Sequence, residues 1–110
     1  MIPFQLTDWS TIEAIEQNGT TGSSFAKAKD YGSFKVRMVE YSANYEADHW
    51  CEKGHIAYCV KGELELHLSD GTSNILKEGA SFQVSDNISS HKVRSKKSAK
   101  LFIIDGEFLK

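Results

Sequence analysis

The chain has 110 residues, which is enough for one domain with a single core and too few for two. Hydrophobic residues make up 40%, charged residues 25%, and the formal net charge is -2, so no strongly basic surface for nucleic acid is expected. No run of about 18 apolar residues predicts a membrane-spanning helix, and the first residues lack the pattern of a signal peptide. We therefore expect a cytoplasmic domain whose partner is a small molecule.

The first 24 residues carry the weakest pattern. Ser10 is followed three residues later by Glu13, a capping-box spacing that predicts one short helix over residues 11–17. Residues 18–24 are rich in Gly, Ser and Thr, which indicates a loop. We expect residues 1–24 to form an N-terminal extension, a short helix or irregular segment, that packs on a β-barrel domain of residues 25–110.

From Phe25 onward the chain shows the pattern of an all-β domain. β-Branched and aromatic residues come in short runs separated by Gly, Asp or Asn. Many short strands with tight turns favour an antiparallel sandwich or barrel. The predicted strands lie near residues 25–29, 34–41, 45–51, 55–60, 63–69, 73–77, 81–84, 90–95 and 100–105.

Two of these strands are predicted most clearly. Leu64, Leu66 and Leu68 alternate with polar residues, so one face of this strand belongs to the core. His67 belongs to the alternating polar set and is expected on the solvent side. The run 99–105 is almost continuously apolar, which predicts a strand covered on both faces.

The segment around residue 50 gathers three residues that bind metals. His49 and Cys51 stand two apart, so in a strand they point to one face. Residues 52–54 suit a three-residue hairpin loop, which would set His55 opposite Cys51. Paired cross-strand residues have Cβ atoms about 4.5 to 5.5 Å apart. The sequence therefore predicts that one thiolate and two imidazoles converge on an ion.

The alternative is that these residues bind nothing. Half-buried histidines and buried free cysteines are common in proteins, and no zinc-finger spacing is present. A disulfide between Cys51 and Cys59 is not expected, because the hairpin would separate the two residues by about 13 Å at the usual strand rise. Cys59 is instead expected to be a core thiol.

The order of motifs in residues 58–65 and 78–82 resembles that of the cupins. In the first cupin motif, an HxH pair is followed by a Glu and then a Gly, and here the same frame holds His49, Cys51, His55 and Gly62. Cys51 thus stands in the place of the second histidine and His55 in the place of the glutamate. The string Asp48-His49-Trp50-Cys51 is also similar to the motif of a group of small DHCW cupins.

The second cupin motif begins with Gly and carries a metal-binding His eleven residues later. Here Gly79 leads to His91, one residue further on, and a bulge near residues 86–87 would absorb the difference. The resemblance implies a double-stranded β-helix, or jelly-roll, cupin barrel. It also implies a homodimer and a metal held inside the barrel by His49, Cys51, His55 and His91.

A set of one thiolate and several imidazoles favours Zn(II), with Fe, Ni or Cu as alternatives. Arg37 and Tyr41 share a strand face with Val39, so they are candidates for a pocket wall, with a solvated outer face as the alternative. Cys59 is a third pocket candidate. We expect a small metal-binding cupin that binds or transforms a compact polar metabolite. The competing hypothesis is a non-catalytic binding or sensing module with a structural or redox-responsive metal.

Overall fold

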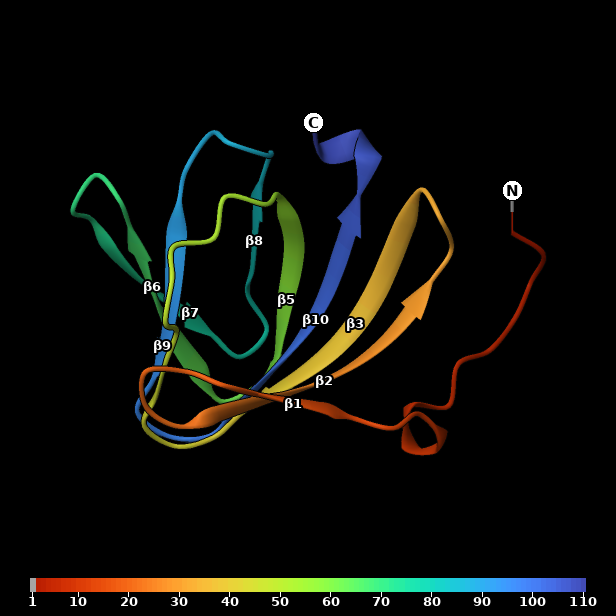
Figure 1. Cartoon of the computed structure of the whole chain (residues 1–110), viewed down its shortest axis with the longest axis horizontal. Coiled ribbons are helices and arrows are strands. Elements are labelled where there is room, and N and C mark those ends of the chain that lie inside the picture. Colours follow the sequence, from red (N-terminus) through yellow and green to blue (C-terminus); the bar gives the residue numbers. More distant parts are fainter. Residues whose placement is uncertain (1) are drawn as a thin grey trace.

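The computed structural model describes residues 2–110 and is built from β-strands (Figure 1). In this range the chain forms two short 3-10 helices, η1 (Trp9–Thr11) and η2 (Glu107–Leu109), and none of its helices is long and apolar enough to span a membrane. The strands are β1 (Ile15–Asn18), β2 (Ser23–Asp30), β3 (Phe34–Tyr41), β4 (Tyr45–Glu46), β5 (His55–Lys61), β6 (Glu63–Leu68), β7 (Ser73–Lys77), β8 (Ser81–Val84), β9 (His91–Ser95) and β10 (Ala99–Gly106).

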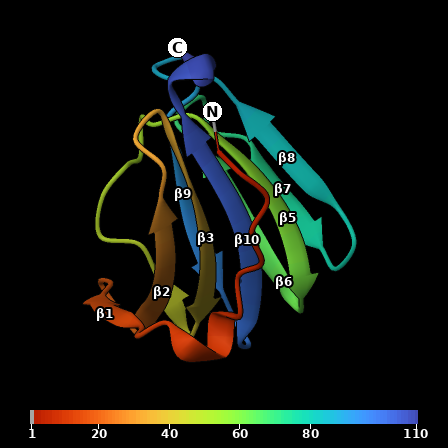
Figure 2. The same ribbon diagram turned by 90° about the vertical axis from the view of Figure 1, so that its right-hand side faces the viewer.

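Two antiparallel sheets face each other. The larger has the order β1-β2-β3-β10-β5-β8, and the smaller has the order β4-β9-β6-β7 (Figures 1 and 2). Consecutive strands therefore alternate between the sheets several times, as in a jelly roll. The predicted all-β fold is confirmed, and the strands predicted from residue 25 onward correspond to β2 through β10.

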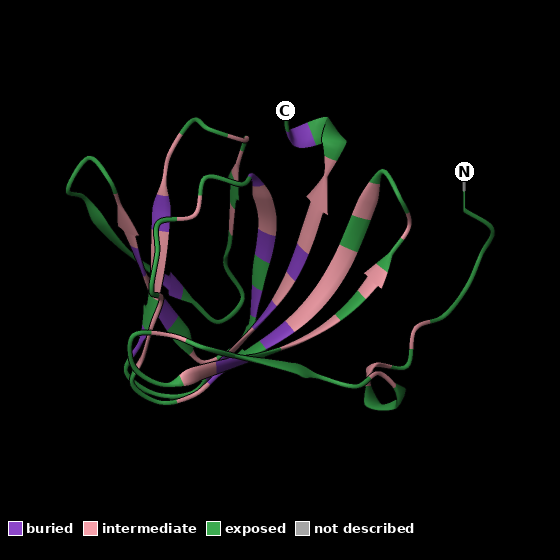
Figure 3. Ribbon diagram, viewed as in Figure 1, coloured by how far each residue is buried: buried purple, intermediate pink, exposed green. Residues whose placement is uncertain are grey.

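The core lies between the sheets and follows the period-two alternation of each strand (Figure 3). In the larger sheet every second residue of β3, β5 and β10 turns inward, and in the smaller sheet Leu64 and Leu66 do the same. The buried hydrophobic cluster consists of Val39, Tyr41, Ala57, Cys59, Leu64, Leu66, Leu76, Ala99, Leu101 and Ile103.

β10 is the central strand of the larger sheet, paired with β3 on one side and β5 on the other (Figure 2). Its inner residues Ala99, Leu101 and Ile103 are buried, whereas Phe102 and Ile104 on the outer face are half-buried. The N-terminal segment lies outside this sheet, on the side away from the smaller one (Figure 1). Trp9 meets Phe102 edge to face with ring centroids 6.3 Å apart, so this segment partly covers the outer face of β10.

The predicted helix over residues 11–17 does not form. Asp8, rather than Ser10, caps the first turn by accepting a hydrogen bond from the Ser10 amide, and the 3-10 helix ends after Thr11. The chain then becomes extended, and β1 pairs with β2. Pairing along a free strand edge outweighs a weak local helix preference here. The larger sheet thus includes residues of the segment expected to pack on the barrel.

The predicted hairpin between residues 45–51 and 55–60 is also wrong. Only Tyr45–Glu46 forms a strand there, and it pairs with β9 in the smaller sheet. Cys51 makes an isolated bridge to His91, while β5 starts at His55 in the other sheet. Residues 52–54 therefore connect two sheets and do not turn a hairpin within one.

Candidate metal centre

Cys51, His55 and His91 converge at one end of the barrel. One ligand atom from each of them lies within 4.8 Å of the others. The Sγ of Cys51 is 3.4 Å from Nε2 of His55, and the rings of His55 and His91 meet edge to face with centroids 5.3 Å apart. The structure therefore brings together three of the four predicted ligands in an arrangement that can hold a metal ion.

Backbone pairing positions these residues. Cys51 and His91 exchange two hydrogen bonds, at 2.8 Å from the Cys51 amide and 3.0 Å from the His91 amide, so they are direct cross-strand neighbours. His55 approaches from the opposite sheet as the first residue of β5. Each sheet thus contributes to the cluster, and an ion there would link the two sheets.

The loops at this end of the barrel are tied to each other. The Gly54 amide donates to Oδ1 of Asp86 at 2.5 Å, and the Asn87 amide donates to the Glu52 carbonyl at 2.8 Å. A Cβ at Gly54 would lie 2.6 Å from the Val84 carbonyl oxygen, so only glycine fits between the loops. Asn87 has φ 60°, a left-handed conformation that Asn tolerates. This turn lies between β8 and β9, four residues before His91.

A carboxylate behind His55 fixes the orientation of its ring. Nδ1 of His55 donates a short hydrogen bond to Asp105, and Asp105 in turn accepts from Arg37 at 2.7 Å (Nε) and 3.3 Å (guanidinium terminus). This leaves Nε2 of His55 pointing at Cys51. Metal-binding histidines usually donate their other ring nitrogen to a carboxylate or carbonyl in this way.

His91 is oriented by the same principle. Its Nδ1 donates to the Ser89 carbonyl at 3.1 Å, which leaves Nε2 free as a ligand atom. The His91 side chain is buried against the ring of Phe82, with ring centroids 5.9 Å apart. Both histidines of the cluster therefore present Nε2, and each is held by a partner on Nδ1.

The environment of the cluster shifts the pKa values of Cys51 and His55. Hydrogen bonds from His55 and then His91 lower the pKa of Cys51 to about 5. Burial acts to lower the pKa of His55, but the hydrogen bonds to Asp105 and Cys51 outweigh it and raise this pKa to about 8. Burial likewise opposes ionisation of Asp105, yet His55 and Arg37 hold its pKa below the usual range. The metal-free cluster is thus a thiolate beside an imidazolium at neutral pH.

The fourth predicted ligand lies outside the cluster. The His49 side chain is 71% exposed, and its Nδ1 contacts Oδ1 of Asp48 at 2.6 Å. The prediction assumed a strand through residues 49–51, but β4 ends at Glu46, so residues two apart do not share a face here. His67 lies on the outer face of β6 beside Glu65, as predicted from its alternation.

The three pocket candidates all turn toward the interior. Tyr41 is buried in the core, and burial raises its pKa above the ordinary value. Arg37 is half-buried and acts on the cluster through Asp105. Cys59 is fully buried, donates to the carbonyls of Lys61 and Gly62, and has a pKa raised by burial. The alternative of a solvated outer face for Arg37 and Tyr41 is not what the structure shows.

Asp105 was not identified from the sequence, although a signal was present. It is two residues after Ile103, and the period-two alternation of β10 sets both on the inner face. A charged residue at an inward position needs a partner. Because β10 and β3 pair with Ile103 opposite Arg37, that partner could be identified only from the strand register.

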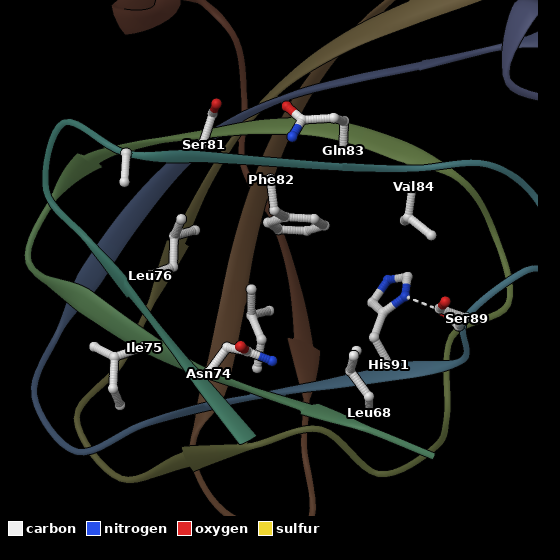
Figure 4. A pocket seen from close by; sticks show the side chains of 12 residues that line it. Leu68, Asn74, Ile75, Leu76, Ser81, Phe82, Gln83, Val84, Ser89 and His91 are labelled. Carbon is white, nitrogen blue, oxygen red and sulfur yellow. Dashed lines mark hydrogen bonds between the residues drawn. The ribbon is translucent and has the colours of Figure 1, made fainter. Parts of the chain in front are cut away.

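Two openings reach the cluster. A cavity of about 360 Å³ between β6, β7 and β8 ends at His91 (Figure 4). A more open hollow of about 430 Å³ lies at Cys51 and is lined by residues 49–53 and 86–87. The cluster is therefore accessible from the barrel interior and from its outer loops.

No family model matches the chain, and no curated protein matches it. Solved structures do resemble it. The polyketide cyclase RemF from Streptomyces resistomycificus is 17% identical, covers 94% of this chain and 80% of its own, and has a TM-score of 0.79. An RmlC-like cupin from Shewanella frigidimarina is 16% identical with coverages of 94% and 91% and a TM-score of 0.74. A predicted oxalate decarboxylase from Thermotoga maritima is 11% identical with coverages of 93% and 98% and a TM-score of 0.78.

These identities are too low to transfer an activity, but the similarity extends over nearly the whole chain. The two antiparallel sheets and their strand order agree with it. The chain therefore has the jelly-roll fold of the cupins.

Proposed function

We propose that this protein is a small metal-dependent cupin that holds one divalent transition metal with Cys51, His55 and His91 and acts on a small molecule in the barrel. The observation that carries the proposal is the convergence of three ligand atoms within 4.8 Å. The hydrogen bond that His55 donates to Asp105 adds the outer-shell partner that metal-binding histidines use. The names of the polyketide cyclase and the predicted oxalate decarboxylase with the same fold describe enzymes of small organic molecules.

Zinc is the proposed metal because one thiolate and two imidazoles suit its preference for S and N ligands. Fe, Ni and Cu remain the alternatives, and copper also binds such a His2Cys set. Three protein ligands leave a fourth position for water or substrate, as in catalytic zinc sites. When bound, the ion would supply Lewis-acid chemistry at that position. Cys51 and the two histidines would hold it, and Asp105 would keep His55 in the required tautomer.

The test is elemental analysis of protein purified without an affinity tag or added metal. We expect about one equivalent of transition metal per chain. Cys51→Ser should lower the occupancy and shift selectivity toward harder ions, because a neutral hydroxyl oxygen replaces a soft thiolate. Cys59→Ala and His49→Ala serve as controls that should keep the metal, since neither residue contributes to the cluster. Full occupancy with the same metal in Cys51→Ser would remove Cys51 from the site.

A sensing module is the second candidate, and one observation favours it. Cys51 is only half-buried, and its pKa is lowered to about 5 by His55 and His91, which are the conditions for a reactive thiolate. Two results would support this candidate: a metal ion with no open ligand position and no catalytic turnover, and reversible release of that ion when the Cys51 thiol is oxidised. Turnover of a small molecule that depends on the metal would support the enzyme.

We also propose that the protein is a homodimer. Tyr58 and Val60 on the outer face of β5 are 48% and 39% exposed, and Phe4 and Leu6 in the N-terminal segment, which runs outside that sheet, are 90% and 86% exposed. Such apolar surface on one side of a small domain is typical of an interface. A second copy packed on the larger sheet would cover it.

A further inference from the structure

The cavity that ends at His91 lies between the free edges of the two sheets. β7 is the last strand of the smaller sheet and β8 the last strand of the larger one. Within residues 2–110 no backbone pairing joins them, so the barrel is open along this seam. Most of the side chains that line the cavity come from β6, β7, β8 and the start of β9 (Figure 4).

The walls of this cavity carry little polarity. Leu68, Leu76, Phe82 and Val84 point into it beside His91 (Figure 4). The other lining residues are Leu66, Asn74, Ile75, Ala80, Ser81, Gln83 and Ser89. Not one of the lining residues is Asp, Glu, Lys or Arg. An ionised ligand body would therefore lose its hydration without gaining a charged partner.

The hollow on the other side of the cluster is different. Its lining includes Glu52, Lys53 and Asp86 beside His49 and Cys51, and it is wide open. Charged or strongly hydrated species are better accommodated there than between β7 and β8. The two openings thus offer opposite environments to molecules that approach the same cluster.

We infer that the cavity between β6, β7 and β8 binds an uncharged, largely apolar molecule, with the one polar end of that molecule directed at His91. This inference deepens the proposed function, on which it rests for the role of that polar end. An apolar cavity of about 150 Å³ accommodates benzene, so a volume of about 360 Å³ has room for about two such rings. The ligand class differs from the polar metabolite expected from the sequence.

The test compares 2-naphthol with 2-naphthoate, which share the two-ring body but differ in charge near neutral pH. Binding is measured by calorimetry on protein freed of metal by chelation. In the metal-free protein we expect 2-naphthol to bind and 2-naphthoate to bind about tenfold more weakly or not at all, because no Lys or Arg lines the cavity to pair with its carboxylate. Equal affinities for the two probes would overturn the inference.

Two substitutions on β7 locate the binding. Asn74→Trp places a large side chain at the cavity wall, whereas Ser73→Trp adds the same bulk on the neighbouring residue, which does not line the cavity. We expect Asn74→Trp to reduce the affinity for 2-naphthol about tenfold and Ser73→Trp to leave it within about twofold. Equal effects would show that the probe binds elsewhere.

Chemical-shift mapping on the unaltered protein checks the location without any substitution. Shifts should concentrate in β6, β7 and β8, and shifts centred on the outer face of the larger sheet would overturn the inference. The measurements also separate this inference from the proposed function. If elemental analysis finds no metal in the chain, the proposed function fails. Binding of 2-naphthol to the metal-free protein still decides, independently of that result, whether the cavity binds an apolar ligand.

Discussion

At the residue scale, Asp105 and Arg37 determine what His55 can do. Neither residue belongs to the cluster of Cys51, His55 and His91. Asp105 accepts a hydrogen bond from Nδ1 of His55, and Arg37 donates two hydrogen bonds to Asp105. A free imidazole could present either nitrogen, and this pair selects Nε2. The same pair lets a charged carboxylate stay inside the barrel, because its charge is matched by the guanidinium.

Asp105→Asn should therefore weaken zinc binding by about 10- to 100-fold, the range found when outer-shell partners are lost. Asn keeps the shape of the side chain but removes the charge that holds the tautomer. Competition with a chromophoric chelator measures the affinity. Glu40→Gln is the matched control, because Glu40 is an exposed carboxylate on β3 whose only ion pair within residues 2–110 is with Lys100. An unchanged affinity in Asp105→Asn would show that His55 needs no such support.

The reactivity of Cys51 should report the lowered thiol pKa. Because a lowered pKa keeps the thiolate at neutral pH, iodoacetamide should alkylate the metal-free protein fast near pH 7, and the rate should fall as pH falls through about 5. Replacing His55 by Asn removes the largest cause of the shift, so the midpoint should move up. Mass spectrometry should find the label on Cys51, since Cys59 is buried and its pKa is raised. Alkylation with a midpoint near the ordinary thiol pKa would contradict this account.

The same shifts affect the stability of the metal-free fold. The lowered pKa of Cys51 stabilises the folded chain above the unfolded thiol pKa, and this contribution is lost as pH falls to about 5. The raised pKa of His55 stabilises the fold below the unfolded imidazole pKa, and this contribution is lost as pH rises through about 8. The thiolate–imidazolium pair therefore exists between these limits.

At the element scale, β9 is the strand that completes the site. It carries His91 and lies between β4 and β6, with Cys51 bridged to its first residue. On the neighbouring strand β6, His67 is opposite Lys92 but turns to the outer face. Two histidines close together on adjacent strands thus lie on opposite faces of one sheet.

His91→Ala should consequently reduce zinc affinity by more than the 10- to 100-fold expected for an outer-shell change, because it removes a ligand. His67→Ala should leave the affinity nearly unchanged, since its ring lies beside Glu65 away from the cluster. Metal titration of the two variants in parallel gives the comparison. Equal losses would refute the assignment of faces, and no loss in His91→Ala would restrict the site to the first motif.

At the scale of the whole molecule, the two sheets differ in what covers them from outside. On the outer face of the larger sheet, Trp9 of the N-terminal segment packs against Phe102 of β10, whereas Tyr58 and Val60 of β5 are exposed. The smaller sheet has an exposed Ile75 on β7, but polar neighbours such as Glu65 and Arg94 share that outer face. An interface between two copies is therefore expected on the larger sheet.

Light scattering at micromolar concentration should give twice the mass of the chain. Val60→Lys should shift the mass toward that of one chain, because it places a charge in the expected interface. Ile75→Lys is the matched control on the other sheet and should remain dimeric. A single-chain mass for the unaltered protein would refute the homodimer.

Membership of the DHCW group remains a prediction from residues 48–51.

The sequence by itself determined the all-β class and most of the strands, because period-two alternation and turn residues are local signals. It also selected Cys51, His55 and His91, which the structure brings together, since the capacity to bind a metal is a property of residue type. The two wrong predictions of local structure, the helix over residues 11–17 and the hairpin at residues 52–54, have one physical origin. Strand β1 and the connection at residues 52–54 depend on which edges pair at long range, and local propensity does not encode that choice.

Only the tertiary structure decided the composition of the site. It excluded His49 from the cluster, because residues 47–50 are not in a strand. It brought Asp105 to His55 across fifty residues of chain, and it left β7 and β8 apart so that an apolar cavity opens at His91. Each of these depends on the register and order of strands distant in sequence. Those are set by how the two sheets pack against each other, so they appear only when the whole core is assembled.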